Sequence, residues 1–338
     1  MKTIEWKDGL VITVDQTKLP TKTVLLKMKE CDEVADAIRG MKIRGAPLLG
    51  VAAAYGLALT AYHSKAETRE QLIRELEASA TTLRKTRPTA MNTFWAIDRI
   101  LKKAHETVGG PRDVAKVVVD EAQKIADEDV KVNRKIGEYG SALIKDGDVV
   151  LTHCNAGSLA TVEYGTALGV IRAAWKQGKR IGVVATETRP QLQGARLTAY
   201  ELKRDGIPVT LITDNMVGFV MAKNLVSLVI VGADRIVRDA VINKIGTYAI
   251  AVLAKEHGVP FYVAAPTSTL DMDHNSSEVV IEERNPEEVT HFRSKRIAPR
   301  GVKAMNPAFD ITPMKYVRAI VTEAGVLSPE NLKQWRRV

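Results

Sequence analysis

From residue 149 onward, short apolar segments alternate with longer segments of helical pattern. The apolar segments cover residues 149–152, 181–185, 209–213, 228–232 and 261–265. The helical segments between them cover residues 158–177, 193–204, 216–223 and 243–257. Alternation of this kind is typical of a parallel sheet that is covered by helices. The sequence therefore predicts an α/β fold whose C-terminal domain is built on a Rossmann-like parallel sheet.

The N-terminal part of the chain has a different pattern. Three short strand-like segments, at 3–6, 10–14 and 23–28, predict a small antiparallel sheet. Helical segments follow at 32–41, 48–63, 67–84, 92–107 and 112–144. We predict a smaller N-terminal domain of antiparallel strands and helices over residues 1–125, and a Rossmann-like catalytic domain over residues 126–338.

Composition narrows the class of protein. The chain has 338 residues, of which 45% are hydrophobic and 26% charged, which excludes a disordered or fibrous protein. The 49 Lys and Arg against 40 Asp and Glu give a net charge of +9. A positive charge favours anionic partners, either phosphorylated metabolites or nucleic acid.

Two loose basic runs could in principle contact nucleic acid. They consist of Arg293, Lys295, Arg296, Arg300 and Lys303, and of Lys333, Arg336 and Arg337. No aromatic side chains interleave with them as a base-stacking platform requires. We predict a solvated surface there and no nucleic-acid partner.

Cysteine usage and hydropathy indicate the compartment. Cys31 and Cys154 are too few for a disulfide framework, which favours a reducing cytoplasm. The sequence opens MKTIEWKDG, without the apolar core of a signal peptide. The uncharged segment 45–62 is rich in Gly and Ala and is broken by Pro47, so we expect a buried helix and not a membrane span.

Polar residues follow each predicted strand of the C-terminal sheet. They lie at 153–157, 186–189, 214–215, 233–235 and 266–269. Ligands of open parallel sheets bind outside the carboxyl ends of the strands. We therefore expect the active site along this rim.

Two residues of the rim have reactive side chains. Cys154 lies between a strand end and the start of a predicted helix, where backbone amides would lower the pKa of its thiol; the alternative is a small buried thiol. His153 beside it is more often structural in such a position. Asp234 ends the apolar segment VSLVIVGAD, where desolvation could raise its pKa for acid–base use; the alternative is a helix N-cap.

The N-terminal part offers a candidate phosphate site. Arg44 precedes the uncharged helix, and Gly45 allows close backbone approach, so the pair could cradle a phosphate; the alternative is a surface arginine. Gly45 and Gly50 have the outer spacing of a P-loop, but Val51-Ala52 replace its Lys-Ser/Thr. No G-x-G-x-x-G motif and no metal-ligand spacing is present, so we predict no cofactor and no metal.

Several motifs, in order and over nearly the whole chain, resemble the methylthioribose-1-phosphate isomerase family. They are IRGAPLLGVAAAYG (43–56), RPTAMN (87–92), LTHCNAGSLAT (151–161), ETRPQLQGARLTA (187–199), ITDNMVGFVM (212–221), VGADRIVRDAVINKIGTYAIAVLAKEHGVPFYVAAPTSTLD (231–271) and IEERNPEEVTH (281–291). The wider superfamily includes ribose-1,5-bisphosphate isomerase and the regulatory subunits of translation initiation factor 2B. The HCNAG–LAT form is the one found in the isomerases.

The resemblance implies an aldose–ketose isomerase that converts 5-methylthioribose 1-phosphate to 5-methylthioribulose 1-phosphate in methionine salvage. It implies a homodimer with Cys154 and Asp234 as catalytic residues, in a cleft between the two domains. The substrate contacts that it implies are Arg44, Gly45, Ala46, Arg87, Gln193, Asn243 and Lys244. The chain departs from the family pattern at Thr186, where Asp is expected, and at Phe219, where His is expected.

Two other functions stay open at this point. A ribose-1,5-bisphosphate isomerase would share the fold and the catalytic pair, but it must hold a second phosphate where methylthioribose has an apolar tail. A regulatory subunit like those of translation initiation factor 2B would bind a partner without catalysis.

Overall fold

The computed structural model describes residues 1–87, 90–292 and 294–332. It divides into two compact units. Unit 1 consists of Met1–Arg134 and Gly157–Gly165, and unit 2 of Lys135–Ala156 and the chain from Thr166 onward. The structure differs from the predicted boundary at 125/126 in two respects. First, the units separate after Arg134, nine residues later than predicted, although both positions lie within one long helix, α5 (Pro111–Ser141). Second, the later segment Gly157–Gly165 belongs to unit 1.

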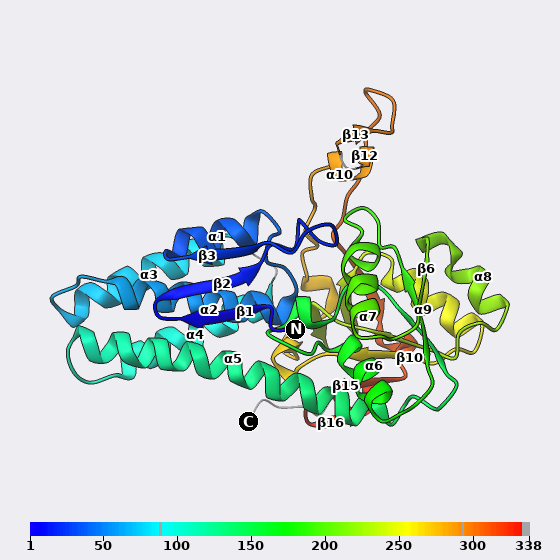
Figure 1. Ribbon diagram of the computed structural model, residues 1–338, viewed down its shortest axis with the longest axis horizontal. Coiled ribbons are helices and arrows are strands. Elements are labelled where there is room, and N and C mark those ends of the chain that lie inside the picture. The colour runs from blue at the N-terminus through cyan, green and yellow to red at the C-terminus, as the bar shows by residue number, and fades with distance from the viewer. Residues whose placement is uncertain (88–89, 293, 333–338) are drawn as a thin grey trace. The chain divides into compact units, whose positions relative to one another are not determined.

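Unit 1 begins with an antiparallel sheet of three strands. These are β1 (Ile4–Lys7), β2 (Leu10–Val14) and β3 (Leu25–Met28), in the order β1-β2-β3. Asp8 and Gly9 have φ angles of 47° and 75°, which a tight two-residue hairpin turn requires. The sheet lies beside the helices α1 (Cys31–Arg39) and α2 (Ala46–His63) (Figure 1). The predicted hairpin is confirmed.

Helix α2 is the centre of unit 1. It is apolar all round, and α1, α3 (Arg69–Arg84) and α4 (Met91–Glu106) all pack against it. A helix without a polar face has to be buried. Gly50 allows the closest of these approaches, because a Cβ there would lie 2.8 Å from the carbonyl oxygen of Asn92. The predicted buried helix is confirmed. Of the helices that the structure describes, none has the length and apolar character needed to cross a membrane.

The segment 157–165 is held by unit 1 and contains only a short 3₁₀ turn, η1 (Ser158–Ala160). The side-chain amide of Gln16 donates to the Leu159 carbonyl over 2.7 Å, and the Val162 amide donates to Asp129 over 2.7 Å. The prediction of one helix over 158–177 is therefore wrong in its first part. These backbone groups bond to unit 1 instead of to one another, and helix α6 starts only at Ala167.

Unit 2 contains a seven-stranded sheet in the order β16-β15-β10-β7-β4-β5-β6. The strands are β4 (Val149–Thr152), β5 (Gly182–Thr186), β6 (Val209–Ile212), β7 (Leu228–Val231), β10 (Phe261–Ala264), β15 (Ala319–Thr322) and β16 (Gly325–Leu327). All neighbours pair in parallel except the edge strand β16. The helices are α6 (Ala167–Lys176), α7 (Ala199–Arg204), α8 (Val217–Ala222) and α9 (Thr247–Glu256). The predicted Rossmann-like sheet is confirmed.

A second sheet in unit 2 was not expected from the sequence. It has the order β11-β8-β9-β14, formed by β11 (Leu270–Asp271), β8 (Arg235–Val237), β9 (Ala240–Lys244) and β14 (Phe309–Pro313). The predicted helix over 243–257 is wrong at its start, because Asn243 and Lys244 pair with β14 and the helix begins at Thr247. The remaining short elements are α10 (Glu287–Thr290), β12 (His291–Phe292), β13 (Lys295–Arg296) and α11 (Pro329–Leu332).

Candidate active site

Cys154 lies directly beyond β4 in a left-handed backbone conformation, with φ of 61°. For a residue other than glycine this conformation is strained, and such strain persists only where the surroundings enforce it. The Cys154 amide donates to the Thr188 hydroxyl over 2.9 Å, and the Thr198 hydroxyl donates to the Cys154 carbonyl over 2.6 Å. Both backbone groups of the strained residue are thus held by side chains.

No helix begins beside Cys154. The expectation that helix N-terminal amides activate its thiol is therefore wrong, because the chain after residue 156 passes to unit 1 and α6 starts at Ala167. The thiol belongs to a half-buried residue, and neither Cys31 nor Cys154 forms a disulfide.

Asn155, on the other side of Cys154, belongs to a buried polar network. Its side-chain amide donates to Glu201 over 2.9 Å and to Thr198 over 3.2 Å. Arg172 donates to Glu201 over 2.7 Å and to Asp205 over 2.6 Å. Buried charges are tolerated where they are paired and hydrogen-bonded in this way. The network fixes the backbone that follows the cysteine.

Asp214 fixes the backbone of the loop after β5, which contains Thr188, the hydrogen-bond partner of the Cys154 amide. It follows β6, and its carboxylate accepts the backbone amides of Thr188 and Arg189, both over 2.7 Å. Thr188 also has a positive φ, of 65°. The ends of β4, β5 and β6 are therefore connected by hydrogen bonds, as the predicted rim requires.

Asp234 follows β7 and comes directly before β8. No helix begins at this half-buried residue, so the alternative of a helix N-cap is wrong. Its amide donates to the Ile242 carbonyl over 3.0 Å, which places Asp234 at the end of the β8–β9 pair beside Asn243. The structure brings these two predicted site residues together through strand pairing that the sequence did not reveal.

Asn243 and Lys244 end β9 and are both buried. The Asn243 amide donates to the Thr247 hydroxyl over 3.0 Å, and the Lys244 ammonium donates to the Ala308 carbonyl over 2.8 Å. Asp310 on β14 accepts the amides of Gly246 and Tyr248, at the N-terminus of α9. Burial raises the pKa of Asp310 to about 6. The Asp310 carboxylate thus lies where the N-terminal amides of α9 would otherwise be available to bind an anion.

Gln193 directly precedes a π-helical turn, η2 (Gly194–Thr198). Its side chain is 2% exposed, and its carbonyl oxygen is buried without a hydrogen-bond partner among the described residues. Buried polar atoms are nearly always paired, and exceptions cluster at functional sites. Gly194 is needed at the start of the turn, because a Cβ there would overlap the Thr186 carbonyl.

The remaining predicted contacts lie in unit 1. Gly45 has φ of 99° and directly precedes α2, whose first residue is Ala46. A Cβ on Gly45 would lie 2.6 Å from the Cα of Ala160, so the loop 157–165 packs on this helix N-terminus. Arg44 is buried, which makes the alternative of a surface arginine wrong. The Arg87 guanidinium lies 3.4 Å from the sulfur of Met41, which precedes Arg44 by three residues.

Comparison with known proteins places the chain in a family. The model of the Initiation factor 2 subunit family matches residues 42–329. The methylthioribose-1-phosphate isomerase of Geobacter metallireducens is 54% identical over 330 residues, covering 97% of this chain and 95% of that protein. That of Acetivibrio thermocellus is 51% identical, covering 99% of this chain and all of that protein. The chain belongs to the methylthioribose-1-phosphate isomerase family.

Solved structures agree with this assignment in fold. The crystal structure of 5-methylthioribose 1-phosphate isomerase from Pyrococcus horikoshii is 47% identical, has a TM-score of 0.92 and covers 98% of this chain and 95% of that one. A second crystal structure is described as translation initiation factor eIF-2B, subunit delta, from A. fulgidus. It is 52% identical, has a TM-score of 0.87 and covers 98% of this chain and 99% of that one. The isomerase family and the translation-factor subunits thus share this architecture.

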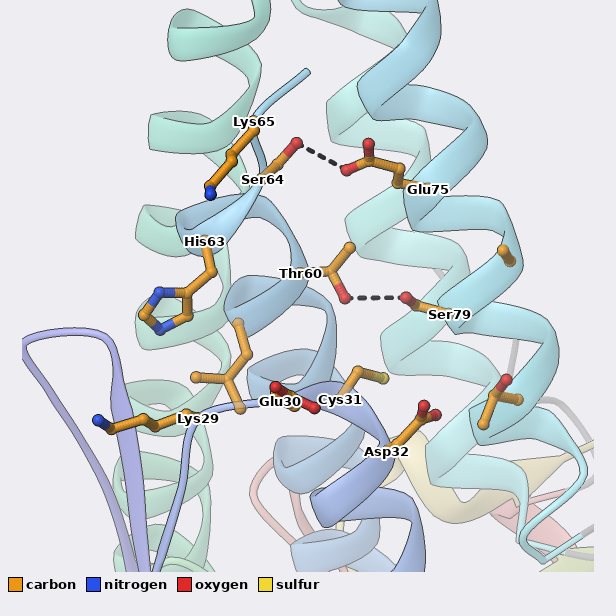
Figure 2. Close-up of a pocket in the computed structure, with 13 residues that line it drawn as sticks. Lys29, Glu30, Cys31, Asp32, Thr60, His63, Ser64, Lys65, Glu75 and Ser79 are labelled. Carbon is orange, nitrogen blue, oxygen red and sulfur yellow. Dashed lines mark hydrogen bonds between the residues drawn. The ribbon is translucent and has the colours of Figure 1, made fainter.

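A pocket of about 460 Å³ lies elsewhere in unit 1, between the start of α1, the end of α2 and one side of α3 (Figure 2). None of the residues predicted from the isomerase family lines it. Its hydroxyl groups bond to one another and to carboxylates: Thr60 to Ser79 over 2.8 Å, and Ser64 to Glu75 over 2.6 Å. Burial raises the pKa of the Cys31 thiol there to about 11. An unionised thiol is a poor nucleophile, so this pocket offers no catalytic group of that kind.

Sequence reasoning missed the threonines that hold Cys154. Thr186, Thr188 and Thr198 are all buried, and they lie in or next to the segment ETRPQLQGARLTA. Threonines are common at such positions, so no local signal distinguished these three from other polar residues of the predicted rim. Within residues 1–87, 90–292 and 294–332, no group of three or more His, Cys, Asp or Glu side chains could hold a metal ion. Of the basic residues considered for nucleic acid, Arg293, Lys333, Arg336 and Arg337 lie outside the described residues.

Proposed function

We propose that this protein isomerises 5-methylthioribose 1-phosphate to 5-methylthioribulose 1-phosphate, an aldose–ketose conversion in methionine salvage. The observation that carries the proposal is the fixed backbone of Cys154, in a chain more than half identical to a methylthioribose-1-phosphate isomerase over nearly its whole length. Strained and fully supported backbone is typical of active sites.

Asp234 and Cys154 are the proposed catalytic residues. The Asp234 carboxyl protonates the ring oxygen, and the bond from that oxygen to C1 breaks. In one route, a hydride then moves from C2 to C1, and the 2-hydroxyl loses its proton to the Asp234 carboxylate. In the other, a Cys154 thiolate takes the C2 proton to give an enol, the thiol then returns that proton to C1, and the 2-hydroxyl loses its proton to the Asp234 carboxylate. Both routes leave a ketone at C2 and the phosphate on C1.

Substrate binding is proposed for the remaining predicted residues. Arg44 and Arg87 supply guanidinium groups, and Gly45 and Ala46 supply amides at the N-terminus of α2, which has no side-chain cap. Such amides and arginines are well suited to phosphate. Asn243, Lys244 and Gln193 are proposed to bind the sugar hydroxyls. The unpartnered Gln193 oxygen supports this role, since a hydroxyl donor would satisfy it.

We further propose a cytoplasmic homodimer. Two cysteines that form no disulfide fit a reducing compartment. Exposed apolar side chains gather around the edge strand β6 and the helices α8 and α9, and they fit a second copy of this chain. They are Leu211, Met216, Phe219, Leu225 and Tyr248, with Leu211 49% and Phe219 58% exposed. Phe219→Glu should give monomers in sedimentation, whereas Val108→Glu, at a 94% exposed position in unit 1, should not.

A second candidate function is supported by one of the solved structures. The 52% identical chain from A. fulgidus is described as a translation-factor subunit. A purely regulatory subunit would have no need of a strained cysteine with both backbone groups bonded. Tight binding of translation initiation factor 2 without turnover of any sugar phosphate would favour this alternative.

Turnover of the purified protein tests the proposal. 5-Methylthioribose 1-phosphate and ribose 1,5-bisphosphate are assayed side by side, and the ketose is detected by carbon NMR. We expect turnover of the first and little of the second. Preference for the bisphosphate would replace the proposed substrate and keep the reaction class. In deuterated water, solvent deuterium at C1 of the product would exclude the hydride route.

A further inference from the structure

His153 has hydrogen bonds at both ring nitrogens and is 2% exposed. Its Nε2 lies 2.8 Å from the Ile245 carbonyl oxygen, and its Nδ1 lies 2.6 Å from the Thr186 hydroxyl. A carbonyl oxygen can only accept, so Nε2 carries a proton. The two bonds join the end of β4 to the end of β5 and to the residue that follows Asn243 and Lys244.

The groups around the imidazole determine whether it has a second proton. Burial lowers the pKa of His153. Of the charged groups near it, Asp214 favours the imidazolium and Lys244 opposes it. Neither of these two hydrogen bonds is to a carboxylate. The ring is therefore neutral, and Nδ1 accepts the Thr186 proton.

A single direction of donation follows from the neutral ring. The Cys154 amide donates to Thr188 over 2.9 Å, and the Thr188 hydroxyl lies 3.3 Å from that of Thr186. Because Thr186 donates to His153, its oxygen is available to accept from Thr188. The Thr188 hydroxyl also lies 3.4 Å from the Thr186 backbone carbonyl, which can accept the same proton. By either acceptor, Thr188 connects Cys154 to Thr186, whose hydroxyl donates to His153, and His153 donates in turn to Ile245.

We propose that His153 is a positioning residue of the isomerase: in its neutral form, with the proton on Nε2, it keeps the Cys154 backbone in register with Asn243 and Lys244 through Thr186 and Thr188. This inference rests on the proposed function. Gly246 contributes space, because a Cβ there would lie 3.1 Å from the imidazole. A displacement of about 1 Å at a reacting group can lower a rate about 100-fold.

The test removes one hydroxyl and keeps the shape. Thr186→Val deletes the donor to His153, and Thr186→Ser restores it. The matched control is Thr312→Val, because the Thr312 hydroxyl is equally buried but has no hydrogen-bond partner among the described residues. We expect Thr186→Val to lower kcat about 10- to 100-fold with KM within about threefold of wild type. Thr186→Ser and Thr312→Val should keep both constants near wild type.

A spectroscopic measurement addresses the tautomer without relying on a variant's activity. Nitrogen-15 histidine labelling and long-range proton–nitrogen NMR should show a proton on Nε2 alone for one of the six histidines at pH 7, and that signal should be missing in His153→Gln. A proton on Nδ1, or on both nitrogens, would overturn the inference. If Thr186→Val does not fold, Thr188→Val interrupts the same series of hydrogen bonds. We expect it likewise to lower kcat while KM stays near the wild-type value.

Three further outcomes are decisive. An active wild type with an equally active, folded Thr186→Val would overturn the inference and leave the proposed function intact. A wild type inactive on every sugar phosphate would overturn both. A fall in activity that only follows the folded fraction, with kcat per folded molecule unchanged, would reduce the threonines to a structural role and would also overturn it.

Discussion

The Thr198 hydroxyl donates to the Cys154 carbonyl over 2.6 Å from the last residue of a π-helical turn. The same hydroxyl accepts the Asn155 amide over 3.2 Å. π-Helical turns are rare and occur frequently at functional sites, since the extra residue re-aims the side chains that follow it. The turn therefore connects Gln193, at its start, to the cysteine through Thr198, at its end.

Thr198→Val should separate positioning from folding. The valine removes the Thr198 hydrogen bond to the Cys154 carbonyl and the one from the Asn155 side chain, which keeps its bond to Glu201. Such a loss costs about 1–3 kcal/mol of the free energy of unfolding. Turnover of the folded variant should fall about 10- to 100-fold, because the carbonyl that fixes the cysteine is released. Urea unfolding and steady-state kinetics measure the two effects. Thr198→Ser should restore both, and a valine variant with normal kcat would remove Thr198 from the active site.

Cys154→Ser tests the thiol itself. Sulfur and oxygen are close in size, so the free energy of unfolding should change little. A hydroxyl is far less acidic than a thiol, so a thiol-dependent step should slow by orders of magnitude. The measurement is kcat with 5-methylthioribose 1-phosphate, with circular dichroism as the folding control. Turnover near the wild-type level would leave Cys154 as a small structural residue.

Gly45→Ala should destabilise unit 1 and weaken substrate binding. A left-handed conformation costs an alanine about 1–2 kcal/mol, and its Cβ would press on the Ala160 backbone at 2.6 Å. Because this residue directly precedes the proposed phosphate amides of α2, KM should rise more than kcat falls. Gly178→Ala is the matched control, since its φ is 83° but nothing lies within 4 Å of the added Cβ. Equal effects in both variants would show that only the backbone conformation matters.

Asp129 makes stability depend on pH. Burial raises its pKa to about 7 from 3.8. Between these values the unfolded chain has lost the proton while the folded chain keeps it. The protonated Asp129 therefore contributes fully to the free energy of unfolding below pH 3.8, and this contribution is lost as the pH rises to about 7. Asp129→Asn removes this dependence and can still accept the Val162 amide.

Urea unfolding of wild type and Asp129→Asn at several pH values measures the difference. Relative to wild type, the variant should gain stability from pH 5 to pH 7, by at most about 1.4 kcal/mol per pH unit, and the gain should level off above pH 7. Parallel curves for the two proteins would show that Asp129 titrates normally in the folded state.

The parallel sheet was predictable because its strands are apolar and bounded by turn residues, so β4 was predicted with its exact ends at Val149 and Thr152. The β8–β9 pair was not predictable in the same way. Its residues AVINK alternate weakly and merge with the following helix in pattern, and only pairing with β14, far along the chain, makes them a strand. The proposed catalytic pair came from rim position and family resemblance together.

The supporting contacts of Cys154 were beyond the sequence for a physical reason. Thr188 and Thr198 are common residues with no local signature, and their role depends on a positive φ at residue 154 that no propensity predicts. The same holds for segment 157–165, whose composition permits a helix. Its bonds to Gln16 and Asp129, which are distant in sequence, exclude one.

Asp234→Asn tests the proposed acid. Asparagine has nearly the same shape, and the amide of residue 234 can still donate to the Ile242 carbonyl, so the β8–β9 pair should stay intact. If the Asp234 carboxyl transfers the proton, kcat should fall by about 10²–10⁴, the usual contribution of a positioned acid or base. KM should change much less, because Arg44 and Arg87 are the proposed phosphate ligands. The wild-type pH–rate profile should have a limb that the variant lacks, and a variant that keeps both its rate and this limb would exclude Asp234 from the mechanism.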